Sequence, residues 1–139
     1  RYYAPFYRQV AEKFKRMGKI LVVHGDGNMQ KLLVSLREAH VDVVEALTPA
    51  PMTSIDIRTT RRLWGDQVTM WGGIASIVLT PTFSDAEFQA YIEDLFAAVA
   101  PGDRFILGFG DNVPTDALWS RIEWLAKYYR EHAAYPLRG

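Results

Sequence analysis

Short apolar runs alternate along this chain with segments whose apolar residues recur every three or four positions. Four runs, at 19–24, 41–47, 67–70 and 104–107, combine apolar and β-branched residues and predict strands that are buried on both faces. Helical spacing precedes the first run and follows every run, over about 3–17, 32–39, 54–64, 84–99 and 116–132. The predicted order is therefore one helix followed by four strand–helix units.

The predicted helices carry recognisable start and stop signals. Ser84 and Glu87 have the spacing of a capping box, and Pro101 follows the end of the same helix. Asn28, in a glycine-rich turn, is expected to cap the helix over 32–39. In the last helix, the side chains expected to face inward are Leu118, Ile122, Leu125 and Tyr129.

This alternation predicts an α/β fold, in which four βα units form a parallel sheet with right-handed crossovers. No linker or low-complexity stretch divides the chain, so we expect residues 1–139 to form a single domain. The chain begins with Arg1 rather than Met, which suggests a fragment of a longer protein.

Composition narrows the classes of partner. Lys plus Arg and Asp plus Glu both number 16, so a nucleic-acid backbone or an anionic membrane is not expected as the main partner. The absence of cysteine excludes disulfides and thiolate metal sites within this chain. No apolar run is long enough to span a bilayer, and no signal peptide is present, so we expect a cytoplasmic protein.

Polar side chains follow the predicted strands, where the carboxyl ends of parallel strands concentrate binding and catalysis. These strand-end residues are His24 and Asp26, Glu45 and Thr48, Trp71, and Asp111 and Asn112. Because each charged residue comes directly after or within an apolar run, rigid backbone should hold it partly out of water, which is how perturbed pKa values and metal sites arise.

Each of these residues also has a purely structural interpretation. His24 is as readily explained by a hydrogen bond to a neighbouring loop, and Asp26 by turn chemistry. Glu45 has the alternative of an ion pair with an arginine. Asp111 and Asn112 have the alternative of an Asx turn before a proline.

Several motifs occur in an order that resembles the C-terminal half of the uroporphyrinogen decarboxylase superfamily, which also contains cobalamin-dependent methyltransferases. The motifs are His24-Gly25-Asp26-Gly27, the stretch 45–51, Trp64-Gly65-Asp66, Gly72-Gly73-Ile74 and the stretch 105–114. The resemblance covers nearly the whole chain. It implies a (β/α)₈ TIM barrel of which this chain supplies strands five to eight, so the N-terminal half is missing.

The resemblance is nearer to the methyltransferase branch, where the first motif is usually His-x-Cys-Gly and its His and Cys bind zinc with a second Cys from the last strand. Those positions correspond here to His24, Asp26 and Asp111, so both thiolates are replaced by carboxylates. One His and two carboxylates form a harder site, which suits Zn²⁺ and also accepts Fe²⁺ or Mn²⁺.

Three functional hypotheses follow. In the first, a metal on His24, Asp26 and Asp111 activates a small-molecule substrate for methyl transfer, and a corrinoid protein donates the methyl group. Glu45 then either supports a metal ligand from behind or faces the substrate. In the second, the parent enzyme decarboxylates a tetrapyrrole carboxylate, with Asp111 assisting protonation. In the third, the isolated chain is catalytically inactive and its open sheet edges drive formation of a homo-oligomer.

Overall fold

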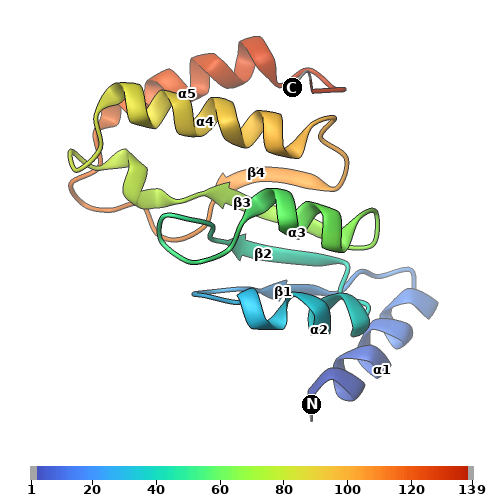
Figure 1. Ribbon diagram of the computed structural model, residues 1–139. Coiled ribbons are helices and arrows are strands. Elements are labelled where there is room, and N and C mark those ends of the chain that lie inside the picture. The colour runs from blue at the N-terminus through green and yellow to red at the C-terminus, as the bar shows by residue number, and fades with distance from the viewer. Residues whose placement is uncertain (1–2, 138–139) are drawn as a thin grey trace.

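The fold is built on a four-stranded parallel sheet with the strands in sequence order, β1-β2-β3-β4 (Figure 1). The computed structural model describes residues 3–137. The strands are β1 (Val22–His24), β2 (Val43–Leu47), β3 (Thr69–Ile74) and β4 (Phe105–Phe109). The predicted α/β class with a parallel sheet is confirmed, and the arrangement is that of a partial TIM barrel.

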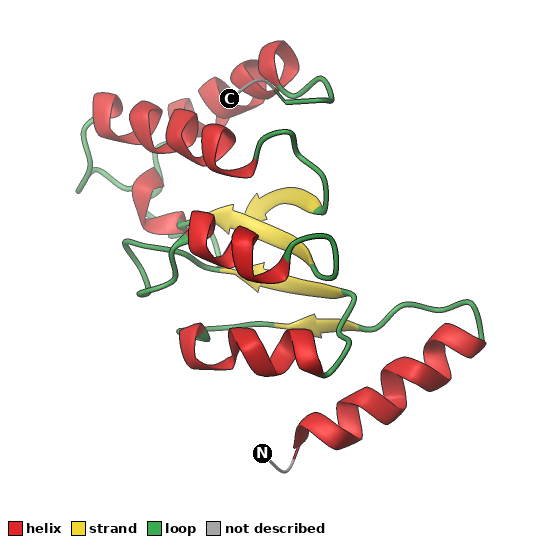
Figure 2. Ribbon diagram, turned by 45° about the vertical axis from the view of Figure 1, so that its right-hand side comes forward, coloured by secondary structure: helices red, strands yellow, loops and turns green. Residues whose placement is uncertain are grey.

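One helix precedes β1, and a helix follows each strand; the helices that follow the strands form a layer on one side of the sheet (Figure 2). They are α1 (Tyr3–Arg16), α2 (Leu33–Glu38), α3 (Ile57–Trp64), α4 (Asp85–Val99) and α5 (Trp119–His132), with short 3₁₀ helices at Gln30–Leu32 and Ser76–Leu79. Neighbouring helices pack on one another in chain order from α1 to α4. Helix α5 packs on α4 through aromatic rings, among them Phe88 against Trp124.

The capping signals decide where these helices begin. The Ser84–Glu87 capping box is confirmed at the start of α4. Helix α3 begins later than predicted because the Asp56 side chain accepts a hydrogen bond from the Thr59 N–H at 2.7 Å. The prediction that Asn28 caps the next helix is wrong, since its side-chain oxygen instead accepts from the Gln30 N–H in a turn that leads into a 3₁₀ helix.

The core lies between the sheet and its helices. Its largest fully buried side chains include Trp64 of α3, Met70 and Ile74 of β3, and Phe88 and Ile92 of α4. Leu125 of α5 is buried as predicted, but Tyr129 is 48% exposed. The buried face of α5 therefore includes fewer residues than its apolar spacing predicted.

The opposite face of the sheet is uncovered in this chain. Val22, Trp71 and Ile106, from β1, β3 and β4, are each 40% or more exposed. Val44 and Met70, which precede Glu45 and Trp71 along their strands, are almost completely buried under the helices. Side chains of a strand alternate between the two faces. The uncovered face is therefore the side that corresponds to the interior of a barrel.

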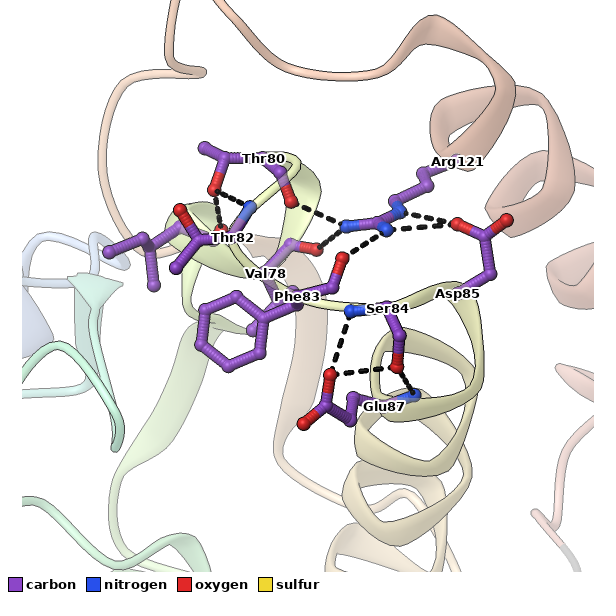
Figure 3. Close-up of polar contacts among 9 residues, drawn as sticks. Val78, Thr80, Thr82, Phe83, Ser84, Asp85, Glu87 and Arg121 are labelled. Atoms are coloured by element: carbon purple, nitrogen blue, oxygen red, sulfur yellow. Dashed lines mark hydrogen bonds and ion pairs between the residues drawn. The ribbon is translucent and has the colours of Figure 1, made fainter.

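A buried arginine joins the last helix to the loop before α4 (Figure 3). Arg121 is 4% exposed and donates hydrogen bonds to the carbonyls of Val78, Thr80 and Phe83 and to the Asp85 carboxylate. Its guanidinium also lies 5.5 Å from the centre of the Phe88 ring. Because guanidinium offers five donors in a fixed plane, this one side chain satisfies several backbone groups at once.

Candidate functional site

The site starts from a pair of side chains on neighbouring strands. His24, the last residue of β1, lies in register with Glu45 of β2. Its Nδ1 atom is 2.5 Å from a carboxylate oxygen of Glu45. When one ring nitrogen of histidine is held by a carboxylate, the ring orientation is fixed and the other nitrogen is left to act on a ligand. The pair therefore has the geometry of an oriented acid–base group.

A cavity of about 270 Å³ opens beside this pair at the carboxyl ends of β1, β2 and β4. Its lining residues are His24, Asp26, Glu45, Ala46, Phe109, Gly110, Asp111 and Asn112. The structure thus brings together all four charged residues that were predicted to lie at the strand ends.

The surrounding carboxylates change the protonation of the imidazole. The hydrogen bond that the imidazole donates to Glu45 raises the pKa of His24 above its usual value, and the negative charges of Asp26 and Asp111 act in the same direction. Partial burial opposes this effect. The imidazole consequently keeps its proton to a higher pH than a free histidine does.

Glu45 owes its position to an irregularity in β2. Val44 pairs with Met70, but Leu47 pairs with Gly72, so two residues of β2 occupy the space opposite a single residue of β3. Ala46 has a φ of 59°, in the left-handed region that non-glycine residues rarely adopt. Such bulges re-aim side chains and occur often beside active sites. The sequence carries no signal that predicts this bulge.

The strand-end residue Thr48 has a structural role rather than a place in the cavity. It is buried, and its hydroxyl donates a hydrogen bond to the carbonyl of Gly110, which joins the ends of β2 and β4. Gly110 makes this approach possible, since a Cβ there would lie 2.5 Å from the Thr48 hydroxyl oxygen and 2.6 Å from the Thr48 Cα. The rim on which the cavity opens is held together by this link.

The loops that carry the remaining site residues are also anchored. The Asn112 N–H donates to the Asp111 carboxylate at 2.6 Å. This bond joins adjacent residues and is not the Asx turn of the alternative interpretation, in which the N–H two residues further on donates. The Asn28 side chain donates to the Ser54 hydroxyl at 2.8 Å, which ties the loop after β1 to the loop before α3. Asp111 therefore both lines the cavity and shapes its own turn.

The predicted metal-ligand set is not assembled in this structure. His24, Asp26 and Asp111 line one cavity, but no three His, Cys, Asp or Glu side chains within residues 3–137 are placed to hold a metal ion together. Glu45 holds the imidazole nitrogen Nδ1 and leaves the other ring nitrogen free, which is also how a metal-binding histidine is usually oriented.

The fold and this rim define a class: a βα protein whose polar cavity lies at the carboxyl ends of parallel strands. The chain belongs to the uroporphyrinogen decarboxylase (URO-D) family, because the family model described as "Uroporphyrinogen decarboxylase (URO-D)" matches residues 1–132. No match is found among curated proteins. Within residues 3–137, no helix combines the length and apolarity needed to cross a membrane.

Proposed function

We propose that this chain supplies the acid–base part of the active site of a URO-D superfamily enzyme of the methyltransferase-like branch. The observation that carries the proposal is the 2.5 Å contact between His24 and Glu45 at the edge of the cavity. In its neutral form, His24 takes the proton of a substrate thiol or hydroxyl while the freed sulfur or oxygen attacks a methyl carbon, whose bond to its donor breaks. Glu45 stabilises the imidazolium that results.

The methyl donor in this proposal is a corrinoid-bearing partner protein. Support for that partner comes from the likeness of the motifs around His24 and Asp111 to the methyltransferase branch. The chain would form the C-terminal half of the barrel in the complete enzyme. The uncovered sheet face, on which Trp71 and Ile106 are exposed, supports this placement because such a face is covered in a closed barrel.

The test is methyl transfer from methylcobalamin to 2-mercaptoethanol, measured with the full-length protein. We expect His24→Gln and Glu45→Gln each to lower the rate by about 10²-fold or more, which is the usual contribution of a positioned acid–base group. Glu38→Gln is the matched control, since Glu38 ends helix α2 and does not line the cavity. Equal rates for all three variants and the parent protein would rule out the proposed role.

The pH profile adds a second test. Because the Glu45 hydrogen bond raises the pKa of His24, Glu45→Gln should lower that pKa toward its usual value of about 6.5. A base acts only when deprotonated, so the acidic limb of the rate profile should move to lower pH in this variant. An unmoved limb would show that the titrating base is not His24.

Decarboxylation of a tetrapyrrole carboxylate is the second candidate. It is favoured by the family match and by the raised pKa of His24, which makes a protonated imidazole available as a proton donor beside Asp111. Binding of uroporphyrin by the full-length protein, followed by its absorption band, tests this candidate. Binding that is lost on His24→Gln would favour decarboxylation over methyl transfer.

The outer edges of β1 and β4 pair with no other strand within residues 3–137, and such edges favour assembly with further strands. An apolar hollow beside β1 is lined by Tyr7, Val23 and Leu36, and a second beside β4 is lined by Leu107 and Ile122, among others. Open parallel edges of this kind favour association. We therefore propose that further strands, from the rest of the protein or from a second copy, complete the sheet. Light scattering of the isolated chain tests this, and a stable monomer would contradict self-association.

A further inference from the structure

An exposed tryptophan lies next to the candidate site without belonging to the set of polar residues described above. Trp71 of β3 is 40% exposed, whereas Trp64 is almost completely buried and its indole N–H donates to the carbonyl of Leu33. The core therefore does not account for Trp71.

The strand register places Trp71 beside two residues that line the cavity. Val44 pairs with Met70, and Leu47 pairs with Gly72, so Glu45 and Ala46 lie opposite Trp71. Both Glu45 and Ala46 line the cavity. Because Val44 and Met70 face the helices, the next side chains on each strand project to the uncovered face. Trp71 is thus the neighbour of Glu45 on the side away from His24.

The indole is supported from one side by a glycine. A Cβ on Gly108 of β4 would lie 3.2 Å from the Cδ1 and Nε1 atoms of Trp71, so the absence of a side chain there lets the ring rest against the backbone of β4. The Cδ1–Nε1 edge of the ring thus lies against β4 while 40% of Trp71 stays open to solvent, so an aromatic surface is available there. Aromatic faces of this kind attract cations through the ring quadrupole, and tryptophan does so most strongly.

The charged residues that line the cavity also favour a cationic ligand. Its lining contains the three carboxylates of Asp26, Glu45 and Asp111 against one imidazole, and it contains no Lys or Arg. A cleft lined mainly by one sign of charge attracts ligands of the opposite sign. We propose that Trp71 is a specificity-determining residue and that the site takes a ligand with an ammonium or quaternary ammonium group held between this indole and the neighbouring carboxylates. This inference rests on the proposed function, because it assigns a ligand class to the same site.

The experiment compares two probes of the same shape, choline and 3,3-dimethylbutan-1-ol, which differ in whether a charged nitrogen or a neutral carbon carries the methyl groups. Affinity of the full-length protein for each is measured by calorimetry. We expect choline to bind about tenfold more tightly, and Trp71→Leu to remove most of that preference. Trp71→Phe should retain part of it. Trp119→Leu should retain all of it, because Trp119 is exposed at the start of α5 and does not lie on the strand next to Glu45.

Equal affinity for the two probes would overturn the inference, as would an undiminished preference for choline in Trp71→Leu. Tighter binding of the trianion tricarballylate than of choline would overturn it as well. Its failure is separable from that of the proposed function. If methyl transfer depends on His24 but choline is not preferred, only the present inference is refuted. If a choline preference depends on Trp71 but no methyl transfer occurs, only the proposed reaction is refuted.

Discussion

Replacing Arg121 with methionine removes the donor group that joins α5 to the segment before α4. The methylene stem is roughly conserved in this substitution, so the change isolates the hydrogen bonds drawn in Figure 3. The Thr80 carbonyl also accepts from the Phe83 N–H and keeps that partner. The carbonyls of Val78 and Phe83 lose the guanidinium that they contact at 2.8 and 2.5 Å.

The expected cost follows from these two carbonyls. Leaving a buried polar group without its partner costs about 1–3 kcal/mol, so the buried Val78 carbonyl predicts a loss of about that size in the free energy of unfolding, to which the part-buried Phe83 carbonyl adds a smaller amount. The ion pair with Asp85 adds little, because that carboxylate is 74% exposed and exposed pairs contribute about 1 kcal/mol or less. A loss of this size is a large part of the stability of a small domain.

Urea unfolding followed by circular dichroism measures this effect. Asp85→Asn is the matched control, since it removes the exposed ion pair and leaves the carbonyl contacts in place, and we expect it to cost about 1 kcal/mol or less. Arg121→Lys should fall between the two variants, because one ammonium group does not reproduce the fixed fan of guanidinium donors. If Arg121→Met costs no more than Asp85→Asn, the buried carbonyl contacts do not stabilise the fold as argued.

Three further predictions concern the rim and its support. Gly72→Ala should destabilise the protein far more than Gly27→Ala by urea unfolding, because a Cβ at Gly72 meets the backbone of β2 whereas nothing lies within 4 Å at Gly27; equal effects would contradict this. Tyr91→Phe should lower the free energy of unfolding by about 1–3 kcal/mol, since the Tyr91 hydroxyl donates to the Gly73 carbonyl at 2.7 Å and accepts from the Ala75 N–H at 3.0 Å. An unchanged unfolding midpoint would refute this prediction. Proton NMR should show a pKa for His24 above 6.5 that falls in Glu45→Gln. The stabilisation from this pair is therefore present below pH 6.5 and is lost as the pH rises through the folded-state pKa, and an unshifted titration in the variant would exclude the pair.

The candidate site could be predicted in part because its charged residues lie within or shortly after the apolar runs that form the strands. His24 ends an apolar run, Asp26 and Asp111 lie within four positions after one, and Glu45 lies within one, so parallel pairing alone sends them to one rim. The prediction that a metal joins three of them had no such basis in geometry. Their mutual placement depends on side-chain rotamers and on the hydrogen bond that Glu45 makes with His24.

Other parts of the site follow no pattern along the chain. The bulge at Ala46 arises where β2 and β3 pair out of step, and the support beneath Trp71 comes from a glycine on β4. The Thr48 hydroxyl reaches a carbonyl 62 residues away. These contacts are unpredictable from local sequence because each depends on two segments that meet only after the sheet has formed.

The sequence by itself determined the order of strands and helices, the covered face of each helix in outline, and the rim at which the charged residues gather. These features depend on local periodicity and on the burial of apolar side chains, which a single chain displays position by position. Tertiary structure alone decided that Arg121 is buried, that Glu45 turns toward His24, and that Trp71 stays exposed. Those outcomes depend on distances between residues far apart in the chain, and only the packed sheet and its helices fix such distances.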